Sequence, residues 1–364
     1  NVIFVHVTLA PSLDVVGEQK TKPTQHSVQE LRRIGIQPDV LCVRCSSTLQ
    51  EKTRKKISMF TNVTEKDVFS CHDVQSIFMV PQILFEQGLV DLIFKKFSKV
   101  GYVDASENWD KWNTIVNSME SNGDTINIAM VGKYVTLADS YVSVNHALKH
   151  AGASIDRPVK IDWIDSETLN GNIETLKKYN GILVPGGFGT RGSEGIIETA
   201  NFARENNIPY LGICFGFQLA AVSFARNVCN LTDANSTEIE NETNDPIIDL
   251  LPEQDGISDL GGSLRLGANT IDIKENSMAY EIYSSNKISK RHRHRYEFNK
   301  KYLDSFASNG MIFSGESDEG RRMEMLEIPS HKFFLGVQFH PEFNSRPGFP
   351  EQSFKAFITA AGTS

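Results

Sequence analysis

The chain contains the stretch Ile208-Pro209-Tyr210-Leu211-Gly212-Ile213-Cys214-Phe215-Gly216, in which an apolar run ends at a cysteine between two glycines. The apolar run predicts a buried strand, and residues 217–226 have the character of a helix, so Cys214 lies at a strand-to-helix turn. Backbone N–H groups and the helix dipole favour a thiolate there, and glycines avoid clashes in so sharp a turn. A small buried cysteine fits the same turn, so the stretch predicts a nucleophile only if it has partners.

Suitable partners follow a second apolar run, residues 333–337. His340 comes just past this predicted strand, where Pro341 ends the ladder. Glu342, two residues on, would point the same way on an extended segment and hold His340 in one tautomer. The order Cys, His, Glu is one of several that build a catalytic triad. A His-Pro-Glu sequence alone is more often a surface turn, but together with the cysteine turn it predicts catalysis.

A glycine-rich loop supplies the third element of the predicted site. The strand-like run 182–184 leads into Pro185-Gly186-Gly187-Phe188-Gly189. Gly187 can bring its N–H close to a substrate carbonyl, and the Phe215 N–H would be the second donor of an oxyanion hole. Such loops also bind phosphates, although this one lacks the Lys-Ser/Thr ending of a Walker A loop.

The order of strand-like and helix-like segments predicts an α/β fold with two domains, each a mainly parallel sheet flanked by helices. We expect the first domain at residues 1–104, a polar linker at 105–125 and the second domain at 126–364. Residues 233–262 are rich in Asn, Asp and Glu and predict an exposed excursion. The expected strands are 2–8, 39–43, 126–131, 159–164, 181–184 and 209–213; the expected helices are 28–34, 51–60 and 141–150, the last capped by Asp139 or Ser140.

Composition narrows the classes of function. The 364 residues are 40% hydrophobic, enough for sizeable cores, and the formal charge of −8 argues against nucleic-acid binding. No apolar run approaches ~18 residues, so no membrane helix is expected. Five scattered cysteines fit a reducing, cytoplasmic setting better than a disulfide framework. Cys42 and Cys45 have the spacing of a zinc or redox pair, but with no second pair nearby we interpret Cys42 as core and expect no metal site in this chain.

Together these residues resemble the class I glutamine amidotransferases, and among them the CTP synthase family. The resemblance covers the chain nearly end to end, and the segments that carry it are 20–28, 186–189, 191–192, 194–195, 234–238, 261–267 and 291–296. It implies glutamine hydrolysis by Cys214, His340 and Glu342, with ammonia used to aminate UTP to CTP at the expense of ATP. The residues that would bind glutamine are Gly187, Phe215, Gly216, Phe217, Gln218, Glu238 and Arg295.

The resemblance also assigns nucleotide sites. The UTP site, which CTP reaches as feedback inhibitor, would consist of Lys20, Thr21, Lys22, Pro23, Thr24, Gln25 and Lys56. On an extended segment Lys20 and Lys22 could face one triphosphate, although such a pair is usually solvated charge. The segment His72-Asp73-Val74 is similar to an ATP-binding segment, and Arg191 is a candidate for a lid over GTP, the allosteric activator. The basic run 291–295 could also grip phosphate; its guanidinium groups disfavour a metal ion.

The first residues, Asn1 to His6, resemble a strand well inside the family's synthetase domain. We therefore expect this sequence to lack the glycine-rich ATP loop and the Mg²⁺ ligands of that domain, and the chain alone to perform only the glutaminase half. The family forms homotetramers and in some cases filaments. Two alternatives stay open: a stand-alone cysteine hydrolase of γ-glutamyl compounds, and a non-catalytic assembly or regulatory module.

Overall fold

The computed structural model describes residues 2–13, 17–97, 106–121, 123–135, 139–169, 171–250 and 264–363. The chain divides into two compact units, Asn1–Val116 and Asn117–Ser364. Residues 105 and 122 of the expected linker, and positions 261–263 of one family-like segment, lie outside the described residues.

The first unit is built on a three-stranded parallel sheet in the order β1-β4-β5. Its central strand is buried on both faces, as a nearly continuous apolar run in a parallel sheet should be. Two of its strands and both predicted helices overlap the expected segments. The elements are β1 (Val5–Leu9), β2 (Ser12–Leu13), β3 (Glu18–Gln19), α1 (Lys22–Arg33), β4 (Val40–Cys45), α2 (Glu51–Thr61), η1 (Glu65–Asp67), β5 (Val68–His72), η2 (Ile77–Met79), α3 (Val80–Glu86), α4 (Leu89–Lys96) and α5 (Ser106–Met119), the last of which runs across the boundary of the units.

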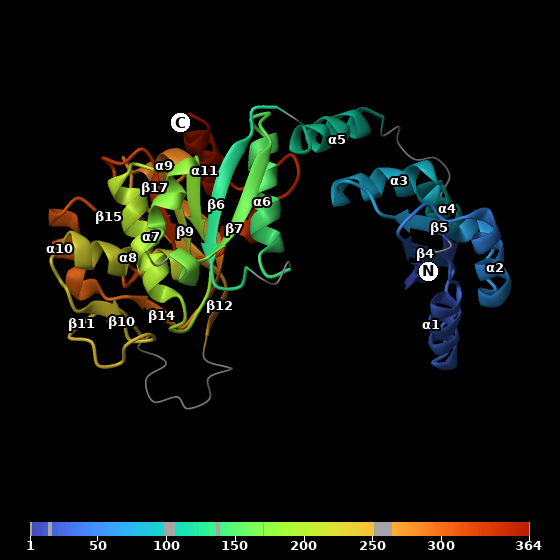
Figure 1. Ribbon diagram of the computed structural model, residues 1–364, viewed down its shortest axis with the longest axis horizontal. Helices are drawn as coiled ribbons and strands as arrows, with labels where there is room; N and C mark the ends of the chain where they lie inside the picture. Colours follow the sequence, from blue (N-terminus) through green and yellow to red (C-terminus); the bar gives the residue numbers. More distant parts are fainter. Residues whose placement is uncertain are drawn as a thin grey trace. The chain divides into compact units, whose positions relative to one another are not determined.

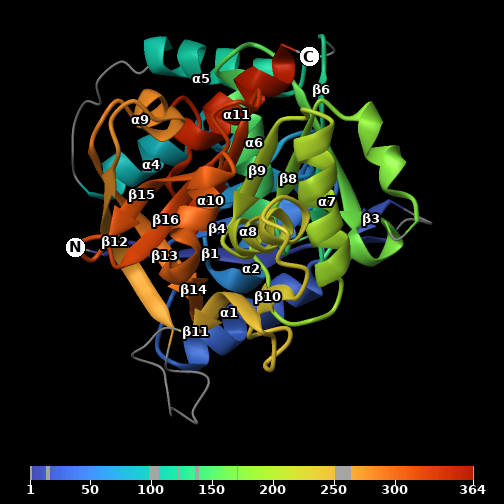
Figure 2. The same ribbon diagram turned by 90° about the vertical axis from the view of Figure 1, so that its left-hand side faces the viewer.

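The second unit is built on a nine-stranded sheet in the order β13-β12-β15-β16-β17-β9-β8-β6-β7. The five strands from β17 to β7 are parallel, and the other four join antiparallel. Figure 2 shows the antiparallel strands β12, β13, β15 and β16 to one side of β9 and β8. Its strands are β6 (Ile126–Gly132), β7 (Val159–Asp165), β8 (Gly181–Val184), β9 (Tyr210–Ile213), β12 (Arg265–Ile273), β13 (Lys287–His294), β15 (Ile312–Ser317), β16 (Arg322–Glu327) and β17 (Phe334–Val337). Its helices are α6 (Val142–Ala153), α7 (Ser193–Glu205), α8 (Phe215–Asn227), α9 (Met278–Tyr283), α10 (Leu303–Ser308) and α11 (Gln352–Gly362), with the short turns η3 (Ser166–Leu169), η4 (Ile173–Lys178), η6 (Lys300–Tyr302) and η7 (Pro341–Asn344).

Helices cover both faces of the parallel part of this sheet (Figure 1). Along β6, Ala129 and Val131 belong to the core under α7 and α8, whereas Ile128 and Met130 belong to the core under α6 and α11. This alternation follows from the two-residue period of a strand and buries an apolar strand on both sides. The prediction of an α/β fold with mainly parallel sheets flanked by helices is confirmed.

Two predictions about local structure are wrong. The segment after Asp233 is not simply exposed: β10 (Ala234–Ser236) and β11 (Asp245–Leu250) form a small sheet with β14 (Tyr296–Phe298). Most residues of this segment are polar, but Ile247 and Ile248 are buried in the core under α8. Neither Asp139 nor Ser140 caps α6, because the residue at its N-cap is Tyr141, which makes no side-chain capping bond.

No single helix among the described residues is long and apolar enough to cross a membrane. The helical segments Ile77–Glu86 and Leu89–Lys96, bent by 60° at their junction, reach the required length and composition only as a pair. The part of the chain that the structure describes contains no cluster of three or more His, Cys, Asp or Glu side chains suited to a metal ion.

Candidate active site

Cys214 occupies the sharp turn between β9 and α8. It lies at the N-cap of α8 with φ 52° and ψ −99°, a conformation that a residue with a side chain rarely adopts. The turn is too tight for side chains on its flanks, since a Cβ on Gly212 would lie 2.6 Å from the Gly216 carbonyl oxygen and one on Gly216 would collide with the Val184 carbonyl. The Cys214 side chain is therefore held at the carboxyl end of the sheet, at the start of a helix.

His340 and Glu342 reach the same point from the end of β17. The His340 Nδ1 and the Glu342 Oε1 are 2.8 Å apart, and both side chains are largely buried. The backbone between them differs from the expected extended segment: His340 is the N-cap of the short 3₁₀ turn η7, which begins at Pro341. A proline in the first turn is compatible with helical geometry, so the two side chains meet across a turn instead of along a strand.

The cysteine, the histidine and the glycine-rich loop converge. A Cβ on Gly186 would lie 2.9 Å from Cε1 of His340 and 3.7 Å from Cβ of Cys214. Burial on its own lowers the pKa of His340, but the neighbouring Cys214 sulfur and the Glu342 carboxylate outweigh burial and raise that pKa to about 11. The protonated, imidazolium form of His340 is thus favoured beside the Cys214 sulfur.

The loop after β8 is held by two charged side chains. Glu238 Oε1 accepts a hydrogen bond of 2.7 Å from the Gly189 N–H. Lys133, at the end of β6, donates to the carbonyls of Phe188 (3.1 Å) and Gly189, and its ammonium lies 4.2 Å from the centre of the Phe215 ring. Burial lowers the pKa of Lys133 to about 8, and Arg191 adds to the effect, while Glu238 and Glu167 oppose it. The sequence reasoning missed Lys133; its one signal was its place directly after a buried strand.

The residues expected to bind glutamine surround this point in different ways. Gly187 packs against Phe215, whose ring is buried. Gln218, one turn into α8, donates to the Tyr296 carbonyl, and the charge of Arg295 acts on Glu238. Burial raises the pKa of Glu238, against the lowering effects of the Gly189 N–H, Lys133 and Arg295. Phe217 is different, because its side chain points from α8 into the hydrophobic core and is fully buried there. It therefore packs behind the site.

The comparisons with known proteins agree with this geometry. Residues 136–360 match the class-I glutamine amidotransferase family, and residues 1–99 match the family described as CTP synthase N-terminus. A CTP synthase of Pyrococcus abyssi is 49% identical over 99% of this chain and 67% of its own length, and one of Staphylococcus carnosus is 48% identical with the same coverage. The chain belongs to the CTP synthase family. A solved glutaminase domain of a Trypanosoma brucei CTPS, with bound acivicin, is 37% identical with a TM-score of 0.62, covering 66% of this chain and 94% of that one.

Members of the CTP synthase family are ligases that carry a glutamine amidotransferase domain, and pyrimidine biosynthesis follows from that membership. The UTP-site residues expected for the family lie together in the first unit, but not on an extended segment. Lys20 pairs with Glu18 at 2.7 Å, whereas Lys22 is the first residue of α1 and lies 5.8 Å from the centre of the Phe60 ring. Lys20 first, and Lys52 and Lys56 more weakly, lower the pKa of Glu18, so these lysines gather around one carboxylate.

The rest of that segment is part of a packed helix start. The hydroxyl of Thr21 accepts a hydrogen bond of 2.9 Å from the Gln25 side chain, and the Thr24 hydroxyl donates to the Leu9 carbonyl. Pro23 stands in the first turn, where its missing N–H costs nothing. The open N–H groups of this helix start, close to Lys20, suit a phosphate.

The ATP segment expected for the CTP synthase family follows β5. His72 is the last residue of the strand, with its Nδ1 3.1 Å from the Ser70 hydroxyl, and Asp73 forms an ion pair with Arg44. Val74 is half-buried just beyond it.

Arg191, the candidate for a lid over GTP, already has ion-pair and hydrogen-bond partners in the structure. Its guanidinium is 2.8 Å from Glu167 and 3.9 Å from Asp165, and it donates to the Lys133 carbonyl.

The basic run at residues 291–295 lies in strand β13, except for its last residue. The arginines and the histidines of this strand face opposite sides. Arg291 and Arg293 face outward, whereas His292 and His294 are buried. The histidines are thus structural: His292 bonds to Glu324 at 2.9 Å and His294 to the Tyr296 carbonyl at 2.9 Å.

Proposed function

We propose that this chain hydrolyses glutamine through a thioester on Cys214 and that the released ammonia serves the ATP-dependent amination of UTP to CTP. The observation that carries the proposal is the cysteine at a helix start facing a histidine that is hydrogen-bonded to a carboxylate. The comparison that supports it is the 49% sequence identity to a CTP synthase over 99% of the chain.

The proposed first half-reaction consumes the proton held by His340. The Cys214 sulfur attacks the side-chain amide carbon of glutamine, and the N–H groups of Gly187 and Phe215 stabilise the oxyanion. As the C–N bond breaks, His340 gives its proton to the departing nitrogen, which leaves as ammonia.

In the proposed second half-reaction, water hydrolyses the thioester. His340 takes a proton from the water as its oxygen attacks the thioester carbon, and the C–S bond breaks. Glutamate leaves, and Cys214 and His340 return to the thiolate–imidazolium pair. Glu342 keeps Nδ1 of His340 occupied, so that the other ring nitrogen faces the sulfur.

Substrate recognition and domain roles complete the proposal. The carboxylate of Glu238 would take the α-ammonium of glutamine, and Arg295 its α-carboxylate or a backbone carbonyl. Residues 1–104 would be the C-terminal part of an amidoligase domain, 105–125 a linker and 126–364 the amidotransferase domain. UTP, or CTP as feedback inhibitor, would bind at residues 20–25 and Lys56, ATP at residues 72–74 and GTP near Arg191.

The described residues hold no cluster suited to Mg²⁺, so they are assigned no step that involves the metal. Family membership supports a homotetramer as the working assembly and a cytoplasmic setting, both of which remain part of the proposal.

The experiment that tests the proposal measures glutamate release from glutamine, with and without GTP, for the wild type and Cys214→Ala. The variant should lose at least about a thousandfold, since removing a nucleophile abolishes the covalent route. Cys229→Ala, which removes another free cysteine of the same unit, is the matched control and should keep wild-type activity. Equal glutamate release by wild type and Cys214→Ala would overturn the assignment.

A further inference from the structure

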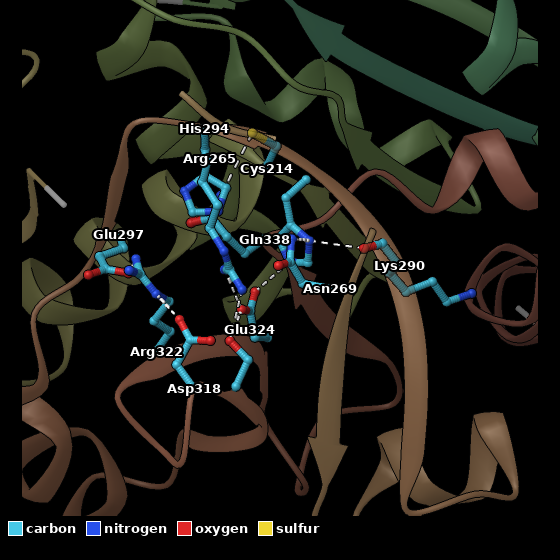
Figure 3. Close-up of polar contacts among 12 residues, drawn as sticks. Cys214, Arg265, Asn269, Lys290, His294, Glu297, Asp318, Arg322, Glu324 and Gln338 are labelled. Atoms are coloured by element: carbon cyan, nitrogen blue, oxygen red, sulfur yellow. Dashed lines mark hydrogen bonds and ion pairs between the residues drawn. The ribbon is translucent and has the colours of Figure 1, made fainter. Parts of the chain in front are cut away.

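A glutamine that the mechanism above does not use touches the nucleophile. Gln338 is 1% exposed, and its side-chain Nε2 lies 3.7 Å from the Cys214 sulfur (Figure 3). Among the residues that the structure describes, this sulfur is the hydrogen-bond acceptor of that amide group. Burying an amide group costs free energy unless its hydrogen bonds are made, so the contact with the sulfur offsets part of this cost.

The backbone places Gln338 beside Cys214. In the parallel pair β9–β17, Val337 is opposite Ile213, and Gln338 and Cys214 are the residues that directly follow this pair. The Cys214 N–H donates to the Val337 carbonyl at 2.7 Å, and the Gln338 N–H donates to the Glu324 carbonyl at 2.8 Å. Two main-chain bonds thus fix the cysteine and the glutamine next to each other.

A relay of hydrogen bonds fixes which end of the amide faces the sulfur. The Gln218 Nε2 donates to the Tyr296 carbonyl at 2.9 Å, which a side-chain oxygen could not do. The same Nε2 donates its other proton to the Gln338 Oε1 at 3.2 Å. The oxygen of Gln338 is therefore turned toward Gln218, and its NH₂ group toward Cys214.

The sulfur has a second contact of opposite sense. As a thiol, Cys214 donates to the Arg293 carbonyl at 3.7 Å. That carbonyl dipole favours the protonated form, whereas an N–H donor favours the anion. In the part of the chain that the structure describes, His340 is the charged group at the sulfur, and Glu342 bonds to the far side of its ring. Gln338 and His340 therefore act together against the Arg293 carbonyl.

We propose that Gln338 is a positioning residue that stabilises and aims the Cys214 thiolate through its side-chain N–H, with Gln218 and the Tyr296 carbonyl setting its orientation. This rests on the proposed function in one respect, that Cys214 is the nucleophile. It assigns to Gln338 a role in the site that a purely packing glutamine would not have, because packing and the bond to Gln218 require only its shape and its oxygen.

The test uses alkylation of Cys214 by iodoacetamide in the full chain, followed by mass spectrometry at pH 5 and pH 8. Gln338→Met keeps the length of the side chain and removes the donor. We expect about a tenfold slower reaction at pH 5 and less than a twofold change at pH 8, since losing a hydrogen bond to a charged group matters most where protons compete for the sulfur. Glutamate release should fall about tenfold as well.

A second variant guards against a simple loss of packing. Gln338→Glu keeps the oxygen that faces Gln218 and puts a carboxylate oxygen where the donor was, so alkylation at pH 8 should fall about tenfold or more. Gln87→Met, which removes a partly buried glutamine of the first unit, is the matched control and should leave Cys214 alkylation unchanged.

The outcomes separate this inference from the proposed function. If Gln338→Met alters the rate equally at both pH values, or both Gln338 variants react like wild type, the role of Gln338 is wrong. If instead wild-type Cys214 reacts no faster than Cys229 and Cys214→Ala still releases glutamate, the nucleophile itself is wrong.

Discussion

At the scale of single residues, His340 controls the state of the nucleophile. Its pKa is raised to about 11, so the imidazolium keeps its positive charge beside the sulfur up to that value and loses it only as the pH rises through it. The rate of Cys214 alkylation by iodoacetamide should therefore stay nearly constant between pH 6.5 and 9. In His340→Asn it should be slower at pH 6.5 and rise about tenfold per pH unit, as for an ordinary thiol.

Cys229 provides an internal control for that measurement. Burial raises the pKa of this thiol, which has no histidine partner among the described residues, so its alkylation should climb throughout the range. A wild-type Cys214 rate that climbs in parallel with Cys229 would contradict the thiolate–imidazolium pair.

The residues of the site differ in how far the sequence predicted them. Cys214 stands out because glycines flank it in a strand-to-helix turn, and His340 because proline and glutamate follow a strand. Lys133 and Gln338 carry only the weaker signal of a place directly after a buried strand. Each acquires its surroundings from the neighbouring strand of a sheet, and the order of strands is not written in the residues next to them.

At the scale of elements, strand β16 carries a buried carboxylate that holds the antiparallel edge of the sheet together. Glu324 bonds to Arg265 of β12 at 2.6 Å (Figure 3). It also bonds to His292 of β13 at 2.9 Å and to Ser317. Burial raises the pKa of Glu324, but His292 first, then Arg265 and Ser317, outweigh burial and lower it to about 2.

The sign of this shift gives a stability prediction. Because the folded pKa lies below the unfolded value, the stabilisation is complete above about pH 4.5 and is lost as the pH falls through 2. Glu324→Gln should lower the free energy of unfolding by about 3 kcal/mol at pH 7, and the difference from wild type should shrink between pH 4.5 and 2. Urea unfolding at several pH values measures it.

Glu316→Gln is the matched control, because this residue of β15 is one-third exposed and lies 3.8 Å from Lys274. It should change the free energy by less than about 0.5 kcal/mol at any of these pH values. A Glu324→Gln difference that does not depend on pH would show that packing, and not the charge of Glu324, stabilises this edge.

The sequence predicts the elements whose buried residues are apolar, but not those whose buried residues are polar. Strands β6, β8 and β9 are apolar runs bounded by turns, and the sequence predicts them, and the more polar edge strand β7, to within a few residues. Strand β13 reads as a run of basic residues because its buried partners, among them Glu324 and Glu351, come from later segments of the chain. The sequence does not predict strands β10 and β11 for a related reason, because their few apolar residues lie among many Asn, Asp and Glu residues.

At the scale of the whole chain, the two units separate the proposed activities. The residues proposed for glutamine hydrolysis lie in the second unit, Asn117–Ser364, and those proposed for UTP lie in the first, Asn1–Val116. The Trypanosoma brucei glutaminase domain matches this chain over 94% of its own length. A fragment of residues 117–364 should therefore fold and react with iodoacetamide at Cys214 within about threefold of the full chain, because a domain with its own core folds alone.

The same pair of proteins tests where UTP binds. UTP should raise the Tm of the full chain in a concentration-dependent way and leave that of the fragment unchanged, since only a ligand of the folded state stabilises it. Lys20→Ala together with Lys56→Ala in the full chain should remove most of the shift, whereas Lys177→Ala, an exposed lysine of the second unit, should not. A UTP shift in the fragment would move the site to the second unit. No shift in either protein would remove the sequence-based reason to prefer a CTP synthase site over a stand-alone hydrolase, which has no use for Lys20 and its neighbours.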